Sequence, residues 1–283
     1  MNWIVLAILL FVISTVMYLT FRKLSLLQTK SEIQNLTLFL PSAVILFVYN
    51  LLNKFNLTLN FREIITVFLG SLFIWAGNVM LLKSIKSSPN PGYTVLIGKS
   101  YVILTVLLSP ILFGSMLTLK SLVLIGFILF FMSLILIEKK NSKQLAKSEW
   151  ILPAFLAFLF WGIMSLLLIS MKNSSLTTEV IIMYLSIFSS LIIGVEMIFR
   201  KVPFKPVKSH SPWLVILGLV GLFFNVMIMA GYKVAPNPGY MDAVNASSVA
   251  AITLFSSLIF KDEITLKKAI GIGGVIFCLI LFL

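Results

Sequence analysis

Ten long apolar runs, separated by short polar connections, constrain this chain more than any other feature of its sequence. A helix needs roughly 20 mostly apolar residues to cross a bilayer, and lipid forces each backbone polar group to be bonded within its own segment. The sequence therefore predicts an all-α membrane protein with ten transmembrane helices and no separate soluble domain. The predicted spans are 3–20, 35–53, 64–82, 92–113, 121–138, 150–171, 178–199, 213–230, 239–260 and 268–283.

The composition agrees with this class and removes several functions. Hydrophobic residues make up 60% of the chain and charged residues 11%, against about 45–50% and about 25% in a soluble domain. The single cysteine, Cys278, and the single histidine, His210, leave no disulfide, Cys/His metal cluster or Cys–His pair. We predict no metal, no cofactor and no enzymatic activity. The net charge of +13 indicates lysines in cytoplasmic loops rather than a nucleic acid partner.

The first apolar run, 3–20, has no basic segment before it and no small-residue cleavage site after it. We interpret it as a retained span rather than a signal peptide.

The pentapeptide Pro-Asn-Pro-Gly-Tyr occurs twice, 147 residues apart. With a shift of 147, segment 78–93 aligns with 225–240 without a gap and with nine identities in sixteen positions. The chain is therefore interpreted as a duplication, with a five-helix repeat at 1–142 and a second at 143–283, which together form one transport domain. Because five is odd, the second repeat must enter the membrane from the opposite face. Inverted repeats of this kind are typical of secondary transporters.

Each copy of the pentapeptide has a plausible local role. An asparagine followed by proline suits the cap and first position of a helix, so the pairs at 90–91 and 237–238 are expected to start the fourth and ninth spans. Tyr93 and Tyr240 are then expected at the membrane interface. The functional alternative is that both turns are hinges that bend as the repeats rock. The candidate hinge residues are Pro89, Pro91, Gly92, Pro236, Pro238 and Gly239.

Two segments resemble a known family. "FLFWGIMSLLLISM" (158–171) is similar to the start of a repeat in EamA-type members of the drug/metabolite transporter superfamily, and "SSLIFKDEITLKKAIGIGGVIF" (256–277) is similar to that family's closing segment. The first repeat departs from the pattern, with Ser14-Thr15 in place of Trp161-Gly162 and Ser115-Met116 in place of Asp262-Glu263. The resemblance implies a metabolite carrier, often an exporter, with a central cavity lined partly by the fourth and ninth spans.

Lys99 is the most unusual charge in the sequence. It lies seven residues past Gly92, hence about 10 Å into the fourth span. Ionisable groups inside a span are costly and need a reason. We expect Lys99 to meet a bound anionic group or a carboxylate partner; the alternative is that its long stem reaches the headgroups.

The ninth span carries a polar stripe. Asp242, Asn245 and Ser248 follow one another at spacings of three, so they share one helix face, and Ser256 extends it. We predict that this stripe contributes to a substrate site, although Asp242 is close enough to the start of the span to stabilise the helix terminus instead. A direct ion pair between Lys99 and Asp242 is not expected, because the two enter from opposite faces.

The remaining candidates are amides and indoles. Asn78 and Asn225 are repeat-equivalent positions that either contact substrate or join helices by hydrogen bonds. Trp75 and Trp161 either wall a cavity or pack in the bundle. Three acidic residues near span ends are assigned to anchoring or local pairing: Glu63, Glu179 and Glu196.

These features favour a secondary transporter for a small polar metabolite, amino-acid-like or carboxylate-bearing, that works by alternating access as an exporter or facilitator in the cell membrane. Facilitated diffusion, exchange and proton coupling all remain open, with Asp242 the acid for the last. Two alternatives stay open: a lipid or lipid-linked flippase, and a membrane scaffold or accessory subunit. The expected partners are a small-molecule substrate and the lipid bilayer, with the chain a monomer or a dimer.

The first testable prediction concerns orientation. Connections after odd-numbered spans hold sixteen lysines and arginines, and those after even-numbered spans hold five. Because positive loops stay in the cytoplasm, both termini are predicted outside, whereas the family resemblance implies termini inside. A C-terminal fusion to a reporter that is active only in the cytoplasm should be inactive; an active fusion would contradict the charge-based orientation.

Overall fold

The computed structural model describes residues 2–87, 91–137, 148–203, 207–261 and 263–283, and these contain helices and no β-strand. Each predicted span corresponds to one long helix or to two short helices in sequence. The α-helices are α1 (Trp3–Leu26), α2 (Ser31–Leu52), α3 (Phe61–Ser87), α4 (Pro91–Lys99), α5 (Tyr101–Phe113), α6 (Leu119–Leu136), α7 (Ile151–Ser170), α8 (Thr178–Phe199), α9 (Ser211–Val234), α10 (Gly239–Ser247), α11 (Val249–Phe260) and α12 (Leu266–Phe282). The 3-10 turns are η1 (Ser148–Trp150), η2 (Met171–Asn173) and η3 (Lys208–His210).

The described helices have the length and surface of a membrane protein. Nine spans are long and apolar enough to cross a bilayer, counting α4 with α5 and α10 with α11 as one span each. The tenth predicted span is α12, which is shorter at 17 residues. Large apolar side chains cover the outer surface; Leu52, Ile111 and Ile198, for example, are each more than three-quarters exposed. Such a surface is stable in lipid and a liability in water.

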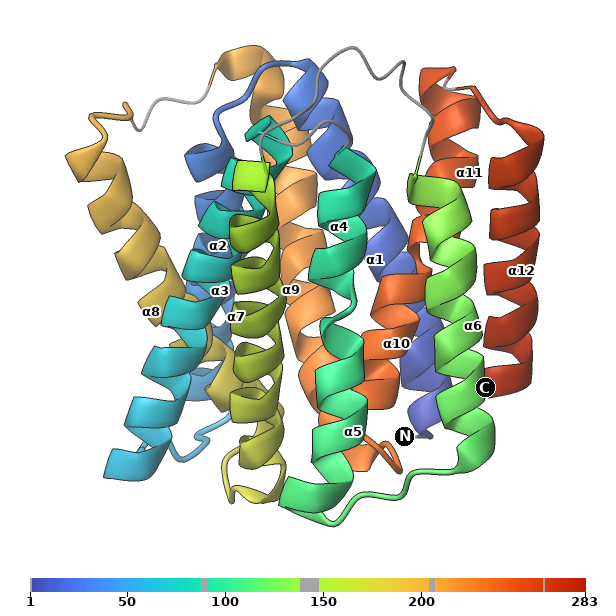
Figure 1. Cartoon of the computed structure of the whole chain (residues 1–283). Coiled ribbons are helices and arrows are strands. Elements are labelled where there is room, and N and C mark those ends of the chain that lie inside the picture. Colours follow the sequence, from blue (N-terminus) through green and yellow to red (C-terminus); the bar gives the residue numbers. More distant parts are fainter. Residues whose placement is uncertain (1, 88–90, 138–147, 204–206, 262) are drawn as a thin grey trace.

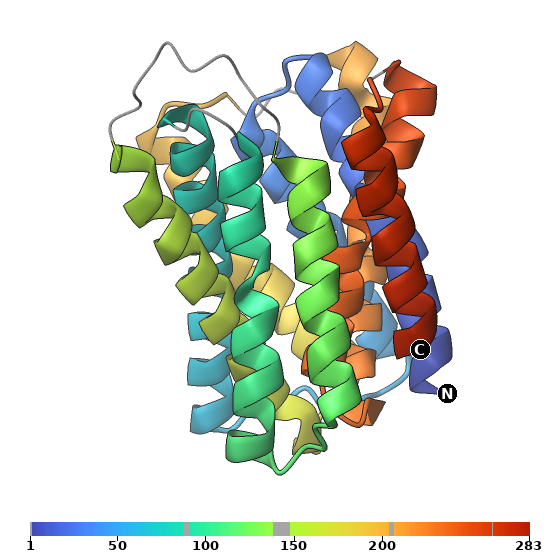
Figure 2. The same ribbon diagram turned by 45° about the vertical axis from the view of Figure 1, so that its right-hand side comes forward.

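The spans run between two ends of the bundle, called the upper and lower ends as they stand in Figure 1. Both chain termini lie at the lower end, and successive spans alternate in direction, so that α1 runs upward and α7 downward (Figures 1 and 2). The upper end therefore carries the connections that follow odd-numbered spans, which hold most of the lysines and arginines.

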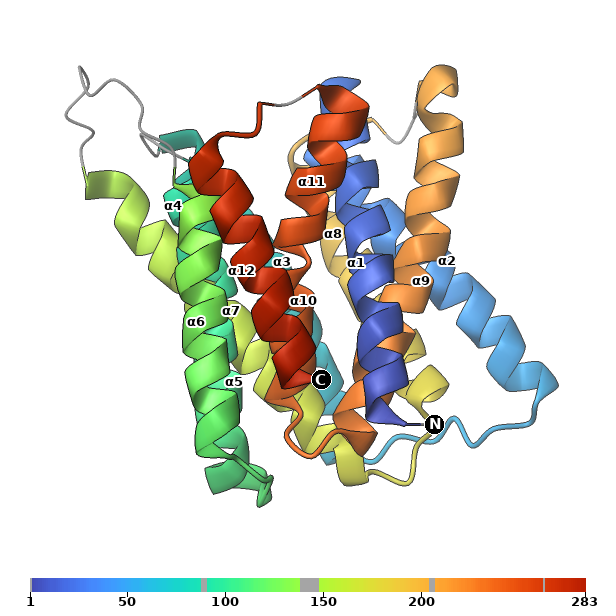
Figure 3. The ribbon, with the colours of Figure 1, turned by 90° about the vertical axis from the view of Figure 1, so that its right-hand side faces the viewer.

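The two halves of the chain are interleaved rather than separate. The most extensive helix contacts are α3 with α7, α1 with α9, α2 with α8, and α6 with α12, and Figure 3 shows α6 beside α12 at one edge of the bundle. Each of these pairs joins a helix before residue 143 to a helix after it. The core is therefore shared between the halves.

The fourth and ninth spans are each broken near the middle of the bundle. Ser100 separates α4 from α5, and Ser248 separates α10 from α11. At each break a serine hydroxyl donates to a carbonyl in the preceding turn: Ser100 Oγ to Leu96 O at 2.8 Å and Ser248 Oγ to Asn245 O at 2.7 Å. Side-chain bonds of this kind compete with the backbone ladder and bend helices. The two breaks, at Ser100 and Ser248, are 148 residues apart. The shift that aligns the two halves of the sequence is 147 residues, so the breaks differ by one residue from equivalent positions.

The pentapeptide turns begin these broken spans, with one difference from the sequence-based expectation. Pro91 is the first residue of α4, as predicted, whereas α10 begins at Gly239 and not at Pro238. Asn237 therefore stands one residue before the N-cap position, although its side chain still accepts from the Gly239 N–H at 2.9 Å. Tyr240 is buried, with its ring against Trp3 and Phe282, and does not face the membrane interface as expected. Pro89 lies outside the described residues.

Glycines allow the broken spans to pack closely. A β-carbon at Gly239 would lie 2.6 Å from Val106 N and 2.8 Å from Val106 Cα, which are backbone atoms of α5 that cannot move aside. At Gly77 it would lie 2.5 Å from Trp161, and at Gly162 it would lie 2.7 Å from Leu104. Gly77 therefore lets α3 approach α7 closely, and Gly162 lets α7 approach α5 closely.

We predict that Gly239→Ala destabilises the bundle by about 1–3 kcal/mol, because overpacking against backbone cannot be relieved by a rotamer change. Gly273→Ala is the matched control, since nothing lies within 4 Å of its added β-carbon, and alanine should leave that helix as stable or more so. Thermal unfolding of both variants in detergent measures the difference. Equal melting temperatures would show that α10 and α5 do not pack as described.

Candidate functional site

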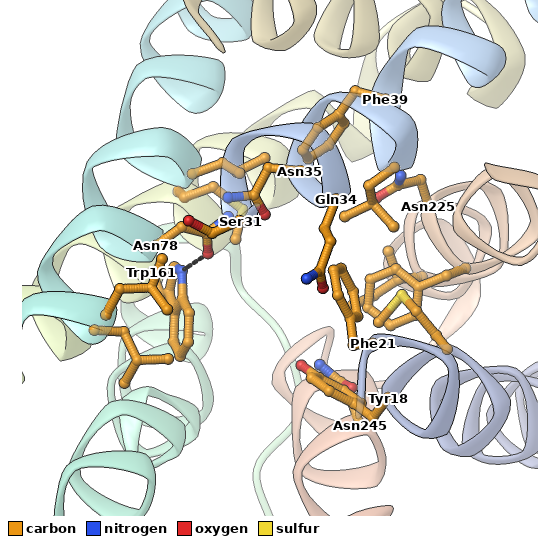
Figure 4. A pocket seen from close by; sticks show the side chains of 18 of the residues that line it. Tyr18, Phe21, Ser31, Gln34, Asn35, Phe39, Asn78, Trp161, Asn225 and Asn245 are labelled. Atoms are coloured by element: carbon orange, nitrogen blue, oxygen red, sulfur yellow. Dashed lines mark hydrogen bonds between the residues drawn. The ribbon is translucent and has the colours of Figure 1, made fainter. Parts of the chain in front are cut away.

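A cavity of about 420 Å³ lies at the centre of the bundle and is lined by side chains from α1, α2, α3, α4, α5, α7, α8, α9 and α10. It extends to the upper end, because its lining includes Ser25 and Ser31 on either side of the α1–α2 connection and Ile85 near the end of α3. Most of its wall is apolar or aromatic. Figure 4 shows the polar side chains that project into it, among them Gln34, Asn35 and Asn78.

Lys99 is the single cationic side chain among the described residues that line the cavity. It is the last residue of α4 and is only 5% exposed. Its Nζ donates to Tyr18 Oη at 2.7 Å and lies 4.5 Å from the centre of the Tyr18 ring. No carboxylate of the described residues pairs with it. The alternative that Lys99 extends to the headgroups is therefore wrong, because the side chain points into the protein.

The contact between Lys99 and Tyr18 crosses from one side of the bundle to the other. Helix α4 packs mainly on α7, α6 and α3, whereas Tyr18 belongs to α1. A lysine ammonium carries three donors, and the tyrosine takes one. The others are available to an acceptor that enters the cavity.

Asp242 is not among the residues that line the cavity, and the prediction that it contacts substrate stays a prediction. It is fully buried in α10 beside Tyr101, which does line the cavity. Its Oδ1 accepts from three hydroxyls: Tyr232 at 2.6 Å, Tyr101 at 3.3 Å and Ser165 at 3.3 Å. Its Oδ2 has no hydrogen-bond partner among the described residues. As expected, no ion pair joins Asp242 to Lys99 within the part of the chain that the structure describes.

The residues of the polar stripe in the ninth span have different surroundings. Asn245 lines the cavity and is held on both sides of its amide, with Oδ1 accepting from Ser14 Oγ at 3.1 Å and Nδ2 donating to Tyr101 Oη at 3.5 Å. Ser248 is fully buried and not in the lining, and its hydroxyl is used at the helix break. Of the predicted stripe, Asn245 alone reaches the cavity.

The two tryptophans have different surroundings. Trp161 lines the cavity and donates from Nε1 to Asn78 Oδ1 at 3.2 Å (Figure 4). Its ring also meets the Tyr101 ring edge-on. Trp75 is not in the lining and instead donates from Nε1 to Glu196 Oε2 at 2.7 Å. Glu196 also pairs with Arg200 at 3.0 Å, the local pair expected from the sequence. Trp75 therefore ties α3 to α8 and is not a wall of the cavity.

The repeat-equivalent asparagines both line the cavity. The Asn78 carbonyl is used by Trp161, so Asn78 joins α3 to α7 as the hydrogen-bond alternative predicted. Asn225 differs, because its buried Nδ2 has no partner among the described residues. An unpaired amide donor at the edge of a cavity is costly unless a ligand or water accepts from it.

The lower end of the bundle is closed beneath this cavity. Asn237 is fully buried and its Nδ2 donates to Val106 O at 3.1 Å, while Met116 N donates to Pro236 O at 3.1 Å. Two lysines add contacts between connections: Lys172 Nζ donates to Phe113 O and Lys233 Nζ to Leu176 O. The second pentapeptide is thus part of a seal, whereas the hinge role of Pro236, Pro238 and Gly239 stays a prediction.

Sequence reasoning missed four hydroxyl residues at the site: Tyr18, Tyr101, Ser165 and Tyr232. Tyr101 carries a detectable signal, because it follows Lys99 by two residues within an apolar span. The others are single polar residues in apolar runs. Whether such a residue reaches the site depends on which helices pack together, and the pattern of polar and apolar residues within one span does not predict helix packing.

Comparison with known proteins shows the fold alone. No family model matches the chain, and no curated protein matches it. Solved structures do match, 29 chains in all. One of them, described only as "Crystal structure of protein", is 15% identical, has a TM-score of 0.77, and is aligned over 96% of this chain and 94% of its own. The bundle is therefore a fold that a solved protein shares over nearly its whole length.

Accessibility of single cysteines tests the shape of the site. In a Cys278→Ser background, Asn35→Cys should react quickly with a water-soluble maleimide, because Asn35 lines the cavity. Ser42→Cys, on the same helix and fully buried, should react at least tenfold more slowly. Similar rates for the two positions would show that the cavity does not reach water as described.

Proposed function

We propose that this protein is a secondary transporter that moves a small anionic solute through the central cavity by alternating access. The observation that carries the proposal is Lys99, a buried ammonium that lines a cavity and has no carboxylate partner among the described residues. Charge inside a span costs roughly 2.5–3.5 kcal/mol on insertion scales. A pure scaffold gains nothing from that cost, whereas a binding site for an anion does.

The lining of the cavity favours an anion over a zwitterion. Among the described residues that line it there is one lysine and no aspartate or glutamate. A bound ammonium group would therefore meet only neutral acceptors. The walls are rich in phenylalanine, leucine and isoleucine. The proposed substrate class, within the carboxylate-bearing metabolites expected from the sequence, is a small anion with an apolar body.

The internal duplication supports alternating access. Helix α3, the third span, packs on α7, the sixth, and helix α1, the first span, packs on α9, the eighth. These two contacts are equivalent if the first span corresponds to the sixth and the third to the eighth. Serine breaks within one residue of equivalent positions in the fourth and ninth spans agree with this. Discontinuous helices at a repeat interface are the usual site of substrate in such transporters. An inverted repeat and an EamA-like ancestry are part of the proposal.

The charge bias supports an orientation for this state. If the lysine-rich upper end faces the cytoplasm, the cavity is open to the cytoplasm and the seal around Asn237 faces outward. This orientation suits an exporter or a facilitator, which loads from the cytoplasm.

Counterflow in liposomes tests the function. Purified protein is reconstituted with an unlabelled solute inside, and uptake of the same labelled solute is followed over a panel of lactate, phenyllactate, phenyl phosphate, leucine, phenylalanine and glutamate. We expect counterflow with at least one anion that has an apolar body. Uptake of none, combined with scrambling of a fluorescent phospholipid, would instead support the flippase alternative.

Lys99 variants test the proposed binding role. Lys99→Met and Lys99→Ala should lower counterflow at least tenfold, since the anion loses its counter-charge. Lys99→Arg should retain partial transport if charge suffices. The matched control is Lys120→Met, an exposed lysine at the lower end, which should transport normally.

Thermal melts on the same samples separate binding from stability. A Lys99→Met protein that melts much lower but still transports would show that Lys99 holds the helices together through Tyr18. A protein unchanged in both assays would contradict any role for the charge.

A further inference from the structure

Asp242 is the one described carboxyl that is completely buried, and the proposed anion site does not use it. It lies in α10, all nine residues of which are buried. The Tyr101 side chain, which lines the cavity, donates to its Oδ1, and below it the turn at 235–238 is bonded to α5 and to the 114–118 connection. In this conformation the carboxyl is therefore occluded from both ends of the bundle.

Two opposing influences act on the charge of this carboxyl. Three hydroxyls point at Oδ1, the shortest from Tyr232 at 2.6 Å, and they favour the carboxylate. Complete burial without a cationic partner, and an Oδ2 with no hydrogen bond among the described residues, favour the neutral acid. Thr105 lies beside the carboxyl, and its own proton goes to Val102 O at 3.1 Å. A rearrangement that removes hydroxyls from Oδ1 would favour the acid, and one that admits water to the carboxyl would favour the carboxylate.

The side chains around Asp242 contain no charge that would fix its protonation. Helix α5 contributes Tyr101 and Thr105, α9 contributes Tyr232, and α7 contributes Ser165. Helices α1, α6, α11 and α12 also pack on α10, and no charged side chain on them pairs with Asp242 among the described residues. Lys99 is the one lysine or arginine in the sequence of the two broken spans (91–113 and 239–260), and it is bonded to Tyr18 and not to Asp242.

A short route connects the carboxyl to the cavity. The Tyr101 hydroxyl donates to Asp242 Oδ1 at 3.3 Å, accepts from Asn245 Nδ2 at 3.5 Å and belongs to a side chain that lines the cavity. A hydroxyl that is bonded to the acid and belongs to the cavity wall can pass a proton by giving one to the carboxylate and accepting another from the cavity. On the other side, opening of the seal at Asn237 would expose the same carboxyl to the lower end.

We propose that Asp242 is a proton-binding site that is loaded from one side of the membrane and unloaded to the other as the protein changes conformation, so that solute transport is coupled to a proton gradient. The inference rests on the proposed transport function. In the unloading step the O–H bond of the Asp242 acid breaks, the electron pair stays on the carboxylate, and water at the open end takes the proton. In the loading step hydronium at the other end returns a proton to the carboxylate, and no oxidant or other reactant is needed.

The sequence offers a direct test of proton binding, because Asp242 and Asp262 are its two aspartates. Protein labelled with ¹³C at the aspartate side-chain carboxyl, in the Asp262→Asn background, reports Asp242 alone. Infrared spectra in nanodiscs are recorded between about pH 5 and pH 9, where an ordinary aspartate is always ionised. We expect an isotope-shifted acid carbonyl band that loses at least half its intensity across this range. An Asp242 that stays ionised throughout, or protonated throughout, would overturn the proposal.

Transport then tests the coupling. Liposomes that contain pyranine and the protein are given the anion that supports counterflow, lactate, phenyllactate or phenyl phosphate. We expect a change of internal pH and at least tenfold accumulation when a pH gradient is imposed. Asp242→Asn should abolish the gradient-driven accumulation, and Asp262→Asn should leave it unchanged. Tyr101→Phe, which keeps the carboxyl and removes the relay, should slow the pH change.

The outcomes separate this inference from the function on which it rests. Counterflow by the wild type without any response to a pH gradient would overturn proton coupling and leave the transporter standing. Gradient-driven accumulation that persists in Asp242→Asn would overturn the role of this residue. Absence of wild-type counterflow with every solute of the panel would overturn the proposed function and the coupling together.

Discussion

The cost of placing charge inside an apolar bundle governs this structure. In lipid, a buried ion has no water to solvate it, so each one must find hydrogen bonds, a counter-charge or a cavity. Lys99 borders a cavity and is bonded to one tyrosine, and Asp242 is bonded to three hydroxyls with one oxygen left unpaired. Both lie in spans that are broken by a serine. Lys99 lies directly at the break of its span, whereas Asp242 lies in the first turn of α10, six residues before the break at Ser248.

The two charges occupy related places under the 147-residue shift that aligns the two halves of the sequence. Tyr18, the partner of Lys99, and Ser165, one partner of Asp242, are exactly one repeat of 147 residues apart in the sequence. The charges themselves are four residues out of register, one helical turn. Each half therefore places a charged residue of its fourth helix against a hydroxyl of its first helix, but one half uses a cation and the other an acid. A common frame with opposite charges suits two coupled ligands, an anion at Lys99 and a proton at Asp242.

The sequence was sufficient for the fold and for part of the site. Apolar runs located all ten spans, because lipid exposure demands apolarity along a whole helix, whichever neighbour it packs on. Three helices, α1, α3 and α9, extend several residues beyond their predicted spans, since apolarity fades before helical bonding does, whereas α8 has the predicted bounds. Lys99, Asn245, Trp161 and the two asparagines line the cavity, and their contact with substrate stays a prediction. Trp75, Ser248 and Asp242 do not line it, because a residue's position on its helix face does not say which neighbouring helix covers that face.

The hydroxyls that bind Asp242 show why the remaining site residues could not be predicted from the sequence. Tyr232 and Ser165 are ordinary single polar residues within α9 and α7 until α10 brings Asp242 between them. Their role is a property of three helices together.

The central claim is that one bundle opens its cavity alternately at two ends. Distances between spin labels measure this directly, with one pair at Gln28 and Ser87 across the upper end and a second at Lys120 and Val234 across the lower end, all exposed in the described structure. Pulsed electron spin resonance in nanodiscs, over a range of pH and with each solute of the panel, should give two populations. In one population the upper pair is far apart and the lower pair is close, and in the other the order is reversed. A single unchanging distance for each pair under all conditions would contradict alternating access.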